Sequence, residues 1–374
     1  MGDLYFKVHR SELVKAVDAA LLATGSKEKF PALDNVLLKP HDNTLIVRGT
    51  NLDLEIEITC DLVEQGRDYG FTVNATALAN IARNLPEAAE LKFEAGKDKA
   101  QVSISAARSR YTLNIMEEAD FPSIGGKPEF AFNISTAALC DMIGKVRYAI
   151  AKGDKTRPYF EGLLFNRLTD QRIEFVSCDG KNLAAVRLDF EAVEDFPQII
   201  VPTKTVDAVA KLLSPLKSDC RININDFKIS FECEGLSLIS KLVDGRYPEY
   251  SRLIPQRDPS FVRADRDQFR RAIARTCAVT REASKDALKL SVSSDGLMLS
   301  LNSGVGESAA EPVEISYDGE AYEKGYNSAF LTKMLESIST PSVRMYGTDP
   351  STGGHFTPDN DAAEDFIVMP MRVK

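Results

Sequence analysis

The feature that most constrains the fold of this sequence is a pattern that occurs three times in the same order. An apolar segment followed by a helical apolar stripe lies at residues 6–17, and it recurs 126 residues later at 132–143 and 256 residues later at 264–273. A second pattern, in which a short polar stretch leads into an amphipathic segment, begins at Val73, Val201 and Tyr326. Phe121-Pro122 and Tyr247-Pro248 close the first two copies. The period is too long for a solenoid repeat. It predicts three domains of ordinary size, at residues 1–126, 127–256 and 257–374.

Each copy is predicted to contain two helices among several strands. In the first copy, Ser11 is the expected N-cap of a helix with an apolar stripe from Leu13 to Leu21, and a second helix is expected from Ala75 to Leu85. Apolar or alternating runs separated by turn residues such as His41-Asp42-Asn43 predict strands. The polar stretch from Thr352 to Asp365 is expected to form a long surface loop before the last strand. The predicted fold class is α+β, with antiparallel sheets and helices on one side of them.

Composition indicates an ordinary soluble protein, because 44% of the 374 residues are hydrophobic and 27% are charged. No apolar stretch approaches the ~20 residues that span a bilayer, and the N-terminus lacks the pattern of a secretion signal. The six cysteines contain no C-x-x-C pair, which favours reduced thiols and a cytoplasmic location. The net charge of −9 argues against a protein whose whole surface binds nucleic acid.

Cations recur on the predicted outward sides of the helices. They are Lys15, Arg83, Lys145, Lys211, Arg271 and Lys333, with Arg275 close to Arg271. Asp18, Asp141 and Asp267 share those sides, so a solvated helix surface is one interpretation. The other is a weakly cationic lining for a polyanion, since binding of DNA without sequence preference needs only neutralisation of phosphates.

The sequence predicts neither an enzyme nor a cofactor or metal site. The three histidines, His9, His41 and His355, lie far apart and none has the spacing of a metal ligand. The phosphate-binding, dinucleotide-binding and nucleophile-elbow motifs do not occur. Ser214-Pro-Leu-Lys217 matches S-x-x-K, but four residues carry little weight and the end of a helix is the simpler interpretation.

Several longer segments resemble one family, the bacterial DNA polymerase III beta subunits, or sliding clamps. They include Arg157-Pro-Tyr-Phe-Glu-Gly162, Val176-Ser-Cys-Asp-Gly-Lys-Asn-Leu183, Ser240-Lys-Leu-Val-Asp-Gly-Arg-Tyr-Pro-Glu-Tyr250 and Val368-Met-Pro-Met-Arg-Val373. Gly49-Thr-Asn-Leu-Asp-Leu54 and Ala119-Asp-Phe-Pro122 also match, so the resemblance extends over essentially the whole chain.

The resemblance implies three similar domains per chain and a head-to-tail homodimer that closes a ring around duplex DNA. It implies that the protein is not an enzyme. It implies instead that the ring tethers a replicative polymerase to DNA and makes it processive. The implied partners are the DNA polymerase III catalytic subunit, the clamp loader, and other polymerases and repair proteins that carry short linear motifs. No membrane partner is implied. Loading onto DNA would need a separate ATP-driven machine, because this chain has no nucleotide-binding loop.

The resemblance also implies three sets of site residues. A partner-peptide pocket would use Phe160, Cys178, Gly180, Lys181, Asn182, Leu183, Pro248, Arg252, Leu253, Asn327, Phe330, Ile367, Met369, Pro370, Met371 and Arg372. The expected DNA-contacting residues are Lys27, Arg83 and Lys204, to which the helix pattern adds Arg271 and Arg275. Ring closure would place Tyr111 and Leu113 against Ala278 and Val279 of a second copy. An apolar slot with a polar rim suits peptides with aliphatic and aromatic anchors, and methionine suits varied partners.

Some positions depart from the family pattern. Lys181-Asn182 stands where the family commonly has His-Arg, Phe330 stands where Tyr is frequent, and the Gly353-Gly354 segment differs from the usual strand-like sequence. Core packing is the other interpretation of Leu183, Leu253 and Met369. Two other classes of function stay open on the residues alone: a triplicated protein-binding scaffold without DNA, and a hydrolase-like enzyme.

Overall fold

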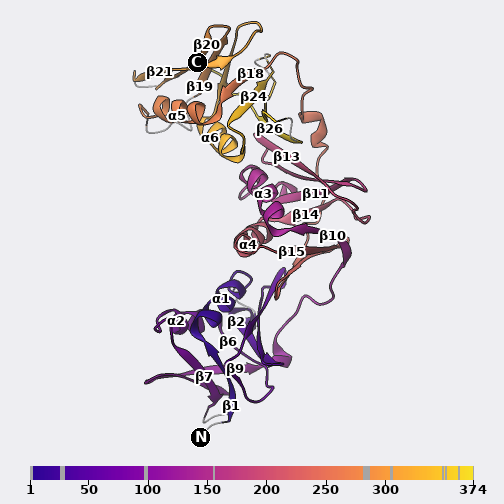
Figure 1. The fold of residues 1–374 in the computed structure, drawn as a ribbon, viewed down its shortest axis with the longest axis vertical. Helices are drawn as coiled ribbons and strands as arrows, with labels where there is room; N and C mark the ends of the chain where they lie inside the picture. The colour runs from indigo at the N-terminus through magenta and orange to yellow at the C-terminus, as the bar shows by residue number, and fades with distance from the viewer. Residues whose placement is uncertain are drawn as a thin grey trace. The chain divides into compact units, whose positions relative to one another are not determined.

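The computed structural model describes residues 3–25, 30–96, 100–154, 156–280, 287–303, 306–347, 349, 352–360 and 363–373. The chain divides into two compact units. Unit 1 comprises Met1–Ala137 and Asp207–Leu242, and unit 2 comprises Ala138–Val206 and Val243–Lys374. Figure 1 shows that both units combine helices with antiparallel strands. The α+β class predicted from the sequence is confirmed.

Unit 1 contains one antiparallel sheet, which has thirteen strands among the described residues. In sheet order the strands are β10 (Glu129–Ser135), β15 (Asp219–Ile224), β16 (Lys228–Cys233), β17 (Leu236–Lys241), β4 (Leu54–Asp61), β3 (Thr44–Thr50), β2 (Asn35–His41), β6 (Phe71–Asn74), β9 (Ser109–Glu117), β8 (Gln101–Ala106), β7 (Glu90–Ala95), β1 (Leu4–His9) and β5 (Glu64–Gln65). The pairing of β4 with β17, in which Ile58 lies opposite Leu236, joins strands of the first two sequence copies into this sheet.

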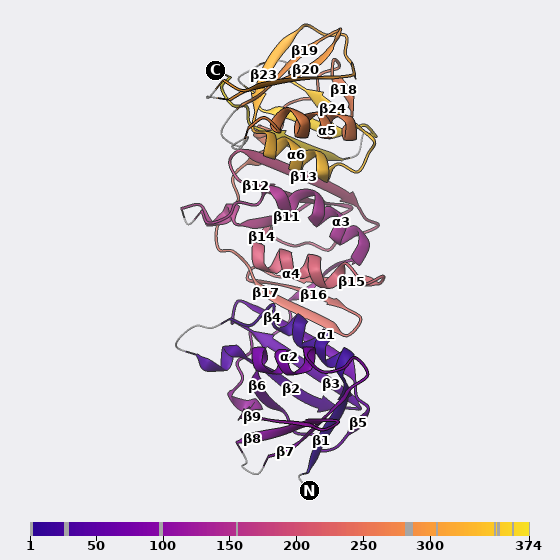
Figure 2. The same cartoon turned by 90° about the vertical axis from the view of Figure 1, so that its left-hand side faces the viewer.

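Two helices of the first copy, α1 (Arg10–Ala20) and α2 (Ala75–Arg83), contact each other and cover one face of this sheet (Figure 2). Leu13 and Val17 of α1 are fully buried, as the apolar stripe predicts. The second copy contributes α3 (Thr136–Val146) and α4 (Thr203–Leu213). Short 3-10 turns follow the same chain order: η1 (Pro31–Asp34), η2 (Glu118–Asp120), η3 (Arg147–Ala149), η4 (Pro158–Phe160) and η5 (Tyr250–Leu253).

Unit 2 contains two antiparallel sheets, of nine and four described strands. The larger has the order β14 (Ile199–Pro202), β11 (Gly162–Thr169), β12 (Arg172–Cys178), β13 (Asn182–Asp189), β26 (Glu364–Val368), β25 (Gly354–Pro358), β24 (Ser342–Tyr346), β18 (Val262–Asp265) and β22 (Ile315–Ser316). The smaller has the order β21 (Ser308–Val313), β20 (Gly296–Asn302), β19 (Leu288–Ser293) and β23 (Tyr322–Tyr326). Helices α5 (Arg266–Cys277) and α6 (Ser328–Ser337) contact each other in this unit.

The β13–β26 pairing is the counterpart in unit 2 of the β4–β17 pairing in unit 1. It places Val186 opposite Glu364 and Leu183 opposite Ile367, so that strands of the second and third copies form one sheet. The sequence pattern shows the copies but not this edge-to-edge pairing between them. The pairing matters for function because the C-terminal residues that follow β26 are thereby held beside the loop that precedes β13.

The turn predicted at His41-Asp42-Asn43 is present. Asp42 and Asn43 have φ angles of 46° and 60°, a left-handed pair that closes a tight hairpin between β2 and β3. The N-cap prediction for the first helix is wrong, because α1 begins at Arg10 and Ser11 lies inside it. The strand β1 runs directly into the helix, and the Arg10 side chain donates to the carbonyl oxygens of Ala82 and Arg83 at 3.0 and 2.9 Å.

The long surface loop expected from Thr352 to Asp365 is also wrong. Residues Gly354–Pro358 form the buried strand β25, and Glu364 and Asp365 are buried in β26. Their polar composition is typical of a loop, but His355, Glu364 and Asp365 are buried in ion pairs rather than exposed. His355 and Asp365, for example, lie 2.7 Å apart with both side chains almost inaccessible to solvent.

Candidate functional site

The residues of the predicted partner site surround a buried aromatic and aliphatic cluster in unit 2. Phe160, Cys178, Leu183 and Ile367 belong to this cluster and are at most 9% exposed. Tyr247 and Tyr250 also belong to it, and neither was among the predicted site residues. The sequence could have indicated them, because both tyrosines belong to the segment Ser240–Tyr250 that carries the family resemblance.

A tight turn before β13 forms the first edge of this cluster. The Asp179 carboxylate accepts hydrogen bonds from the backbone N–H groups of Lys181 and Asn182 at 2.8 and 2.6 Å, and from the Asn182 side chain at 2.9 Å. Gly180 has a φ of 84°, a conformation that residues with a Cβ rarely adopt. A Cβ there would also lie 3.1 Å from a guanidinium nitrogen of Arg157. The Asp-Gly pair therefore builds the turn, and Asn182 serves as an internal hydrogen-bonding partner.

The segment after β26 forms a second edge. The backbone N–H of Met369 donates to the carbonyl oxygen of Lys181 at 2.8 Å. The backbone N–H of Met371 donates to the carbonyl oxygen of Gly325 at 2.7 Å. These bonds hold the segment 369–372 against two parts of unit 2 that are far apart in sequence. The Met369 side chain stays 43% exposed beside the buried Ile367. Pro370 and Met371 are half-buried, and Arg372 is exposed.

The turn η5 and the residues before it form a third edge. Leu253 is 54% exposed although it follows the buried Tyr250 by only three residues. Pro248 and Arg252 are exposed, and Arg252 pairs with Glu249 at 2.8 Å. A cavity of about 660 Å³ adjoins this edge, lined among others by Asn166, Leu168 and Pro248. Of the predicted partner-site residues only Pro248 lines it, so this cavity lies beside the predicted site rather than within it.

Asn327 and Phe330 occupy the start of α6. Asn327 is the N-cap, and its side-chain oxygen accepts from the N–H groups of Ala329 and Phe330 at 2.9 and 3.3 Å. The Lys181 ammonium lies 6.0 Å from the centre of the half-buried Phe330 ring. The structure therefore brings Phe330 to the Asp179–Asn182 turn. The direct role of Asn327 is to cap the helix that presents Phe330.

The buried cluster beneath these edges is uncharged at neutral pH. Burial raises the pKa of the Cys178 thiol, and burial likewise raises the pKa of the Tyr247 hydroxyl. Both groups therefore remain protonated. The site combines the exposed side chains of Leu253 and Met369 with the uncharged buried cluster. Its exposed cations are Lys181, Arg252 and Arg372. Such a surface suits an apolar peptide segment with acidic or polar neighbours.

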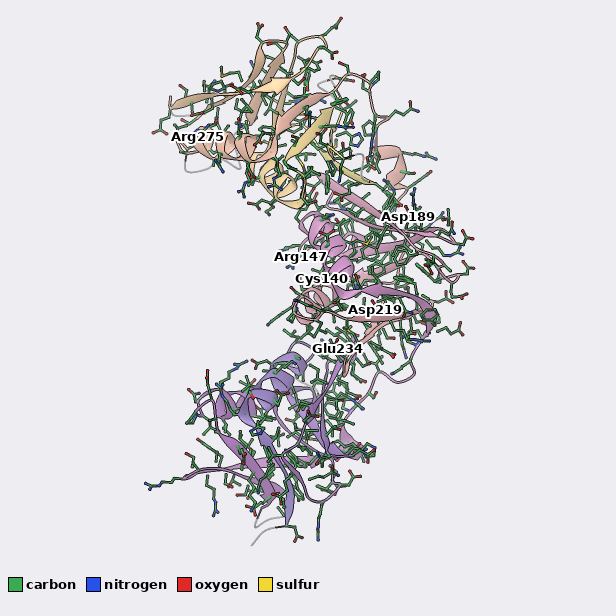
Figure 3. The ribbon with its side chains drawn as sticks, in the orientation of Figure 1. Cys140, Arg147, Asp189, Asp219, Glu234 and Arg275 are labelled. Atoms are coloured by element: carbon green, nitrogen blue, oxygen red, sulfur yellow. The ribbon has the colours of Figure 1, made fainter. Side chains whose placement is uncertain are left out.

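The predicted DNA-contacting cations are dispersed over several helices. Arg83 is exposed at the end of α2 but forms two hydrogen bonds with Asp18, at 3.1 and 2.6 Å. Lys204 is exposed in the first turn of α4, and Arg271 is exposed on α5. Arg275, labelled at the end of α5 in Figure 3, pairs with Glu311 at 3.0 Å. Lys27 lies outside the described residues.

The prediction that Lys145 faces outward is wrong. Its side chain is only 13% exposed, and its ammonium lies 2.6 Å from Asp141 and 2.8 Å from Glu364. The sequence pattern placed this lysine away from the apolar stripe of α3 correctly. It could not show that β26, from the third copy, supplies a carboxylate on that side of the helix. Lys145 is therefore not an exposed cation of α3.

The four predicted dimer residues lie on two exposed parts of the chain. Residues 109–114 of β9 pair with β8, whereas only residues 115–117 pair with β6, so in the described structure the first half of β9 has one open edge. Tyr111 and Leu113 lie in this half and pack partly against the core of unit 1. Ala278 is exposed and Val279 is half-buried just after α5, which contacts the edge strand β21.

The described residues hold no group of three or more histidine, cysteine, aspartate or glutamate side chains that could bind a metal ion. Among these same residues, none of the helices is long and apolar enough to cross a membrane.

Comparison with known proteins gives one consistent result. A beta sliding clamp of Caulobacter vibrioides is 29% identical over 373 residues, covering 98% of this chain and 99% of that protein. A crystal structure of the DNA polymerase sliding clamp from Pseudomonas aeruginosa superposes with a TM-score of 0.90 at 28% identity, covering 99% of this chain and all of that one. The Caulobacter crescentus beta sliding clamp gives a TM-score of 0.93 at 28% identity, with complete coverage of both chains.

Family models give the same assignment along the whole chain. Residues 4–125 match the N-terminal domain of the DNA polymerase III beta subunit, residues 133–249 match its central domain, and residues 251–372 match its C-terminal domain. The matches follow one another in the family's order. This chain belongs to the DNA polymerase III beta subunit family.

Proposed function

We propose that this chain is a DNA sliding clamp, a non-catalytic subunit that makes a replicative DNA polymerase processive. The observation that carries the proposal is the ordered match of nearly the whole chain to the three domains of the DNA polymerase III beta subunit. The domains of this chain are residues 1–126, 127–256 and 257–374. Bacterial DNA is replicated in the cytoplasm, and the protein works there.

Two copies of the chain form a head-to-tail ring. The open edge of β9 and the edge strand β21 are the two surfaces that would pair, because an edge strand presents unsatisfied backbone donors and acceptors. Tyr111 and Leu113 then face Ala278 and Val279 of the partner subunit. The small Ala278 contributes little apolar area to this contact. Two different patches on each copy generate a closed ring when the rotation between copies permits it.

Duplex DNA passes through the ring and is held without reading of its sequence. Lys27, Arg83, Lys204, Arg271 and Arg275 contact phosphates weakly. The ion pair between Arg83 and Asp18 is exposed, and exposed pairs contribute only about 0–1 kcal/mol, so a phosphate can compete for the arginine. A net charge of −9 is compatible with this role, because topological linkage replaces tight binding and few phosphate contacts permit sliding.

Partner proteins bind at the surface around Leu253 and Met369. These partners are the DNA polymerase III catalytic subunit, the clamp loader, and other polymerases and repair proteins with short linear motifs. The two exposed side chains flank a buried apolar cluster that includes Leu183 and Ile367, and they offer area that an aliphatic or aromatic anchor can cover. The neighbouring cations Lys181, Arg252 and Arg372 favour a motif with polar or acidic residues beside its anchors.

Primer extension with a polymerase of this family tests the proposal. The chain is loaded onto primed DNA by a clamp loader and ATP, and excess heparin then traps every polymerase that dissociates. We expect much longer products with the chain than without it, and a return toward the shorter products when Leu253 and Met369 are both replaced by alanine. Phe227→Ala is the control, because this residue is 74% exposed in unit 1 and has no place in the proposed sites. Product lengths that do not change on addition of the native chain contradict the proposed function.

A further inference from the structure

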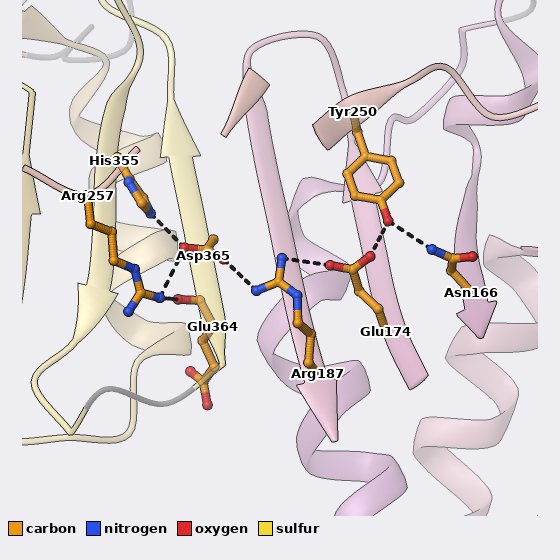
Figure 4. Close-up of polar contacts among 8 residues, drawn as sticks. All are labelled: Asn166, Glu174, Arg187, Tyr250, Arg257, His355, Glu364 and Asp365. Atoms are coloured by element: carbon orange, nitrogen blue, oxygen red, sulfur yellow. Dashed lines mark hydrogen bonds and ion pairs between the residues drawn. The ribbon is translucent and has the colours of Figure 1, made fainter. Parts of the chain in front are cut away.

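A chain of buried polar contacts runs through unit 2 next to the partner site (Figure 4). The Tyr250 hydroxyl donates to one carboxylate oxygen of Glu174. The other oxygen of Glu174 lies 2.7 Å from Nη2 of Arg187, and Nη1 of the same arginine lies 2.6 Å from Oδ2 of Asp365. Oδ1 of Asp365 lies 2.7 Å from Nε2 of His355. One guanidinium therefore bridges two carboxylates that come from different strands.

The two carboxylates of this chain are almost completely removed from water, and the Arg187 side chain between them is 19% exposed. Glu174 is 2% exposed and Asp365 is 4% exposed. Burial opposes ionisation of Asp365, but the hydrogen bonds from His355 and Arg187 outweigh it and hold the pKa of this carboxyl well below its usual range. Burial and the hydrogen bond to Glu174 raise the pKa of Tyr250, so its hydroxyl keeps the proton that it donates. At neutral pH, Asp365 is therefore ionised and Tyr250 is protonated.

Buried ion pairs of this kind are costly. Replacing them with apolar residues is often neutral or stabilising, whereas removing one member alone destabilises strongly. Such a network is therefore better explained by the unique geometry that it enforces than by the stability that it contributes. The geometry in question is the mutual placement of the elements that the network connects.

The network connects two edges of the partner site. Tyr250 begins η5, the turn that ends at Leu253. Asp365 lies in β26, which leads directly into Met369. Glu174 and Arg187 lie opposite each other on the adjacent strands β12 and β13, which form the rigid link between the two edges. The exposed Leu253 and Met369 are thus each within four residues of an anchor in the same ionic chain.

We infer that Tyr250, Glu174, Arg187 and Asp365 are positioning residues that set the separation of Leu253 and Met369 and thereby the affinity of the site for partner peptides. The inference rests on the proposed function, because it assumes that peptides bind at this surface. None of the four residues needs to touch the peptide. They act through η5 on one side and through the segment after β26 on the other.

The test compares Tyr250→Phe, Asp365→Asn and the double variant. Figure 4 shows that Glu174 and Arg187 connect Tyr250 to Asp365. The probe is a fluorescein-labelled hexapeptide with a Leu-Phe pair at its C-terminus, and the readout is fluorescence anisotropy. A lost hydrogen bond to a charged group predicts that each single variant binds about tenfold more weakly. The fold-loss of peptide affinity in the double variant should be much smaller than the product of the two single fold-losses, because the effects of coupled residues are non-additive.

Glu57→Gln is the matched control. It removes a carboxylate charge from an ion pair with Arg48, but it does so in unit 1, on the β3–β4 hairpin. Its peptide affinity should equal that of the native chain. Unchanged affinity in Tyr250→Phe, or single losses that multiply fully in the double variant, would overturn the inference.

Amide hydrogen exchange on the free chain gives a readout that does not depend on the peptide. Tyr250→Phe should accelerate exchange at the Met369 N–H, which donates to Lys181 on the far edge of the site. A Tyr250 hydroxyl that stabilises only its own turn would leave the Met369 amide unchanged, and that result also overturns the inference. If the native chain fails to bind the probe, the proposed partner site fails, while the exchange rates still decide whether the network couples the two edges.

Discussion

The Leu253→Ala substitution tests the partner site at its most exposed apolar residue. Full burial of a leucine side chain contributes about 1.5–3 kcal/mol relative to exposure. Leu253 is 54% exposed in the free chain, so about half of that amount is still available when a peptide covers it. After allowance for the area that alanine retains, we expect the binding free energy to fall by about 1 kcal/mol, which is about fivefold in Kd.

Fluorescence anisotropy with the Leu-Phe hexapeptide measures this change, and thermal unfolding measures stability in parallel. The free energy of unfolding should change by less than about 1 kcal/mol, because half of the side chain is already in water. Phe227→Ala, at a residue that is 74% exposed on unit 1, should leave the peptide Kd unchanged. Equal Kd values for the native chain and Leu253→Ala would refute the reasoning, and so would an equal loss in Phe227→Ala.

Four further substitutions test a turn, a buried lysine and a helix cap. Gly180→Ala should lower the free energy of unfolding by at least about 1 kcal/mol, because φ is 84° and the new Cβ would lie 3.1 Å from Arg157; a native-like denaturation midpoint would contradict this. Burial lowers the pKa of Lys324 from 10.5 to about 8, so the unfolded chain binds more protons between these pH values and stability should rise with pH there by up to about 3 kcal/mol. Lys324→Met should remove that slope in urea titrations at pH 8–10.5, and an unchanged slope would show that another group causes it. Asn74→Ala should cost about 1 kcal/mol because Asn74 caps α2, whereas Ser11→Ala, inside α1, should cost less than about 0.5 kcal/mol; urea denaturation that ranks them the other way would contradict the cap assignment.

Local patterns in the sequence were sufficient to predict most of the secondary structure. The apolar stripe with Leu13 and Val17 predicted α1, and the Asp42-Asn43 pair predicted the hairpin turn between β2 and β3. These features depend on neighbours within one or two turns of the chain, and periodicity records such neighbours directly. The threefold repeat predicted three similar segments along the chain, and three family-domain matches follow one another in the same order.

Contacts between the copies could not be predicted in the same way. Lys145 has the spacing of a solvent-facing residue on α3, but Glu364, more than two hundred residues later, makes it an ion-paired residue with a side chain only 13% exposed. The polar residues Glu364 and Asp365 resembled part of a loop for the same reason, since Lys145 of α3 and Arg187 of β13 pair with them from far away in the sequence. Burial of a charge depends on its partner, and the partner is set by the β13–β26 register rather than by the local sequence.

Some residues of the candidate site could be assigned from the sequence, and others only from the folded structure. The partner-site residues were assigned through resemblance, and the structure brings most of them around one buried cluster in unit 2. Neither composition nor spacing would have grouped Gly180, Leu253 and Met369, which are separated by many residues. The tyrosines beneath the site and the ionic chain through Arg187 were missed, because only the folded structure shows that Glu174 and Asp365 share one guanidinium.

The central claim is that the protein is linked to DNA by topology, and one retention experiment tests it most directly. The labelled chain is loaded onto a nicked circular plasmid by a clamp loader and ATP, separated from free protein by gel filtration, and the plasmid is then cut once by a restriction enzyme. The account predicts that the protein stays on the circle and is lost after the cut, because a sliding ring leaves through free ends. Equal retention on circular and cut DNA would contradict the account and would indicate ordinary contact binding.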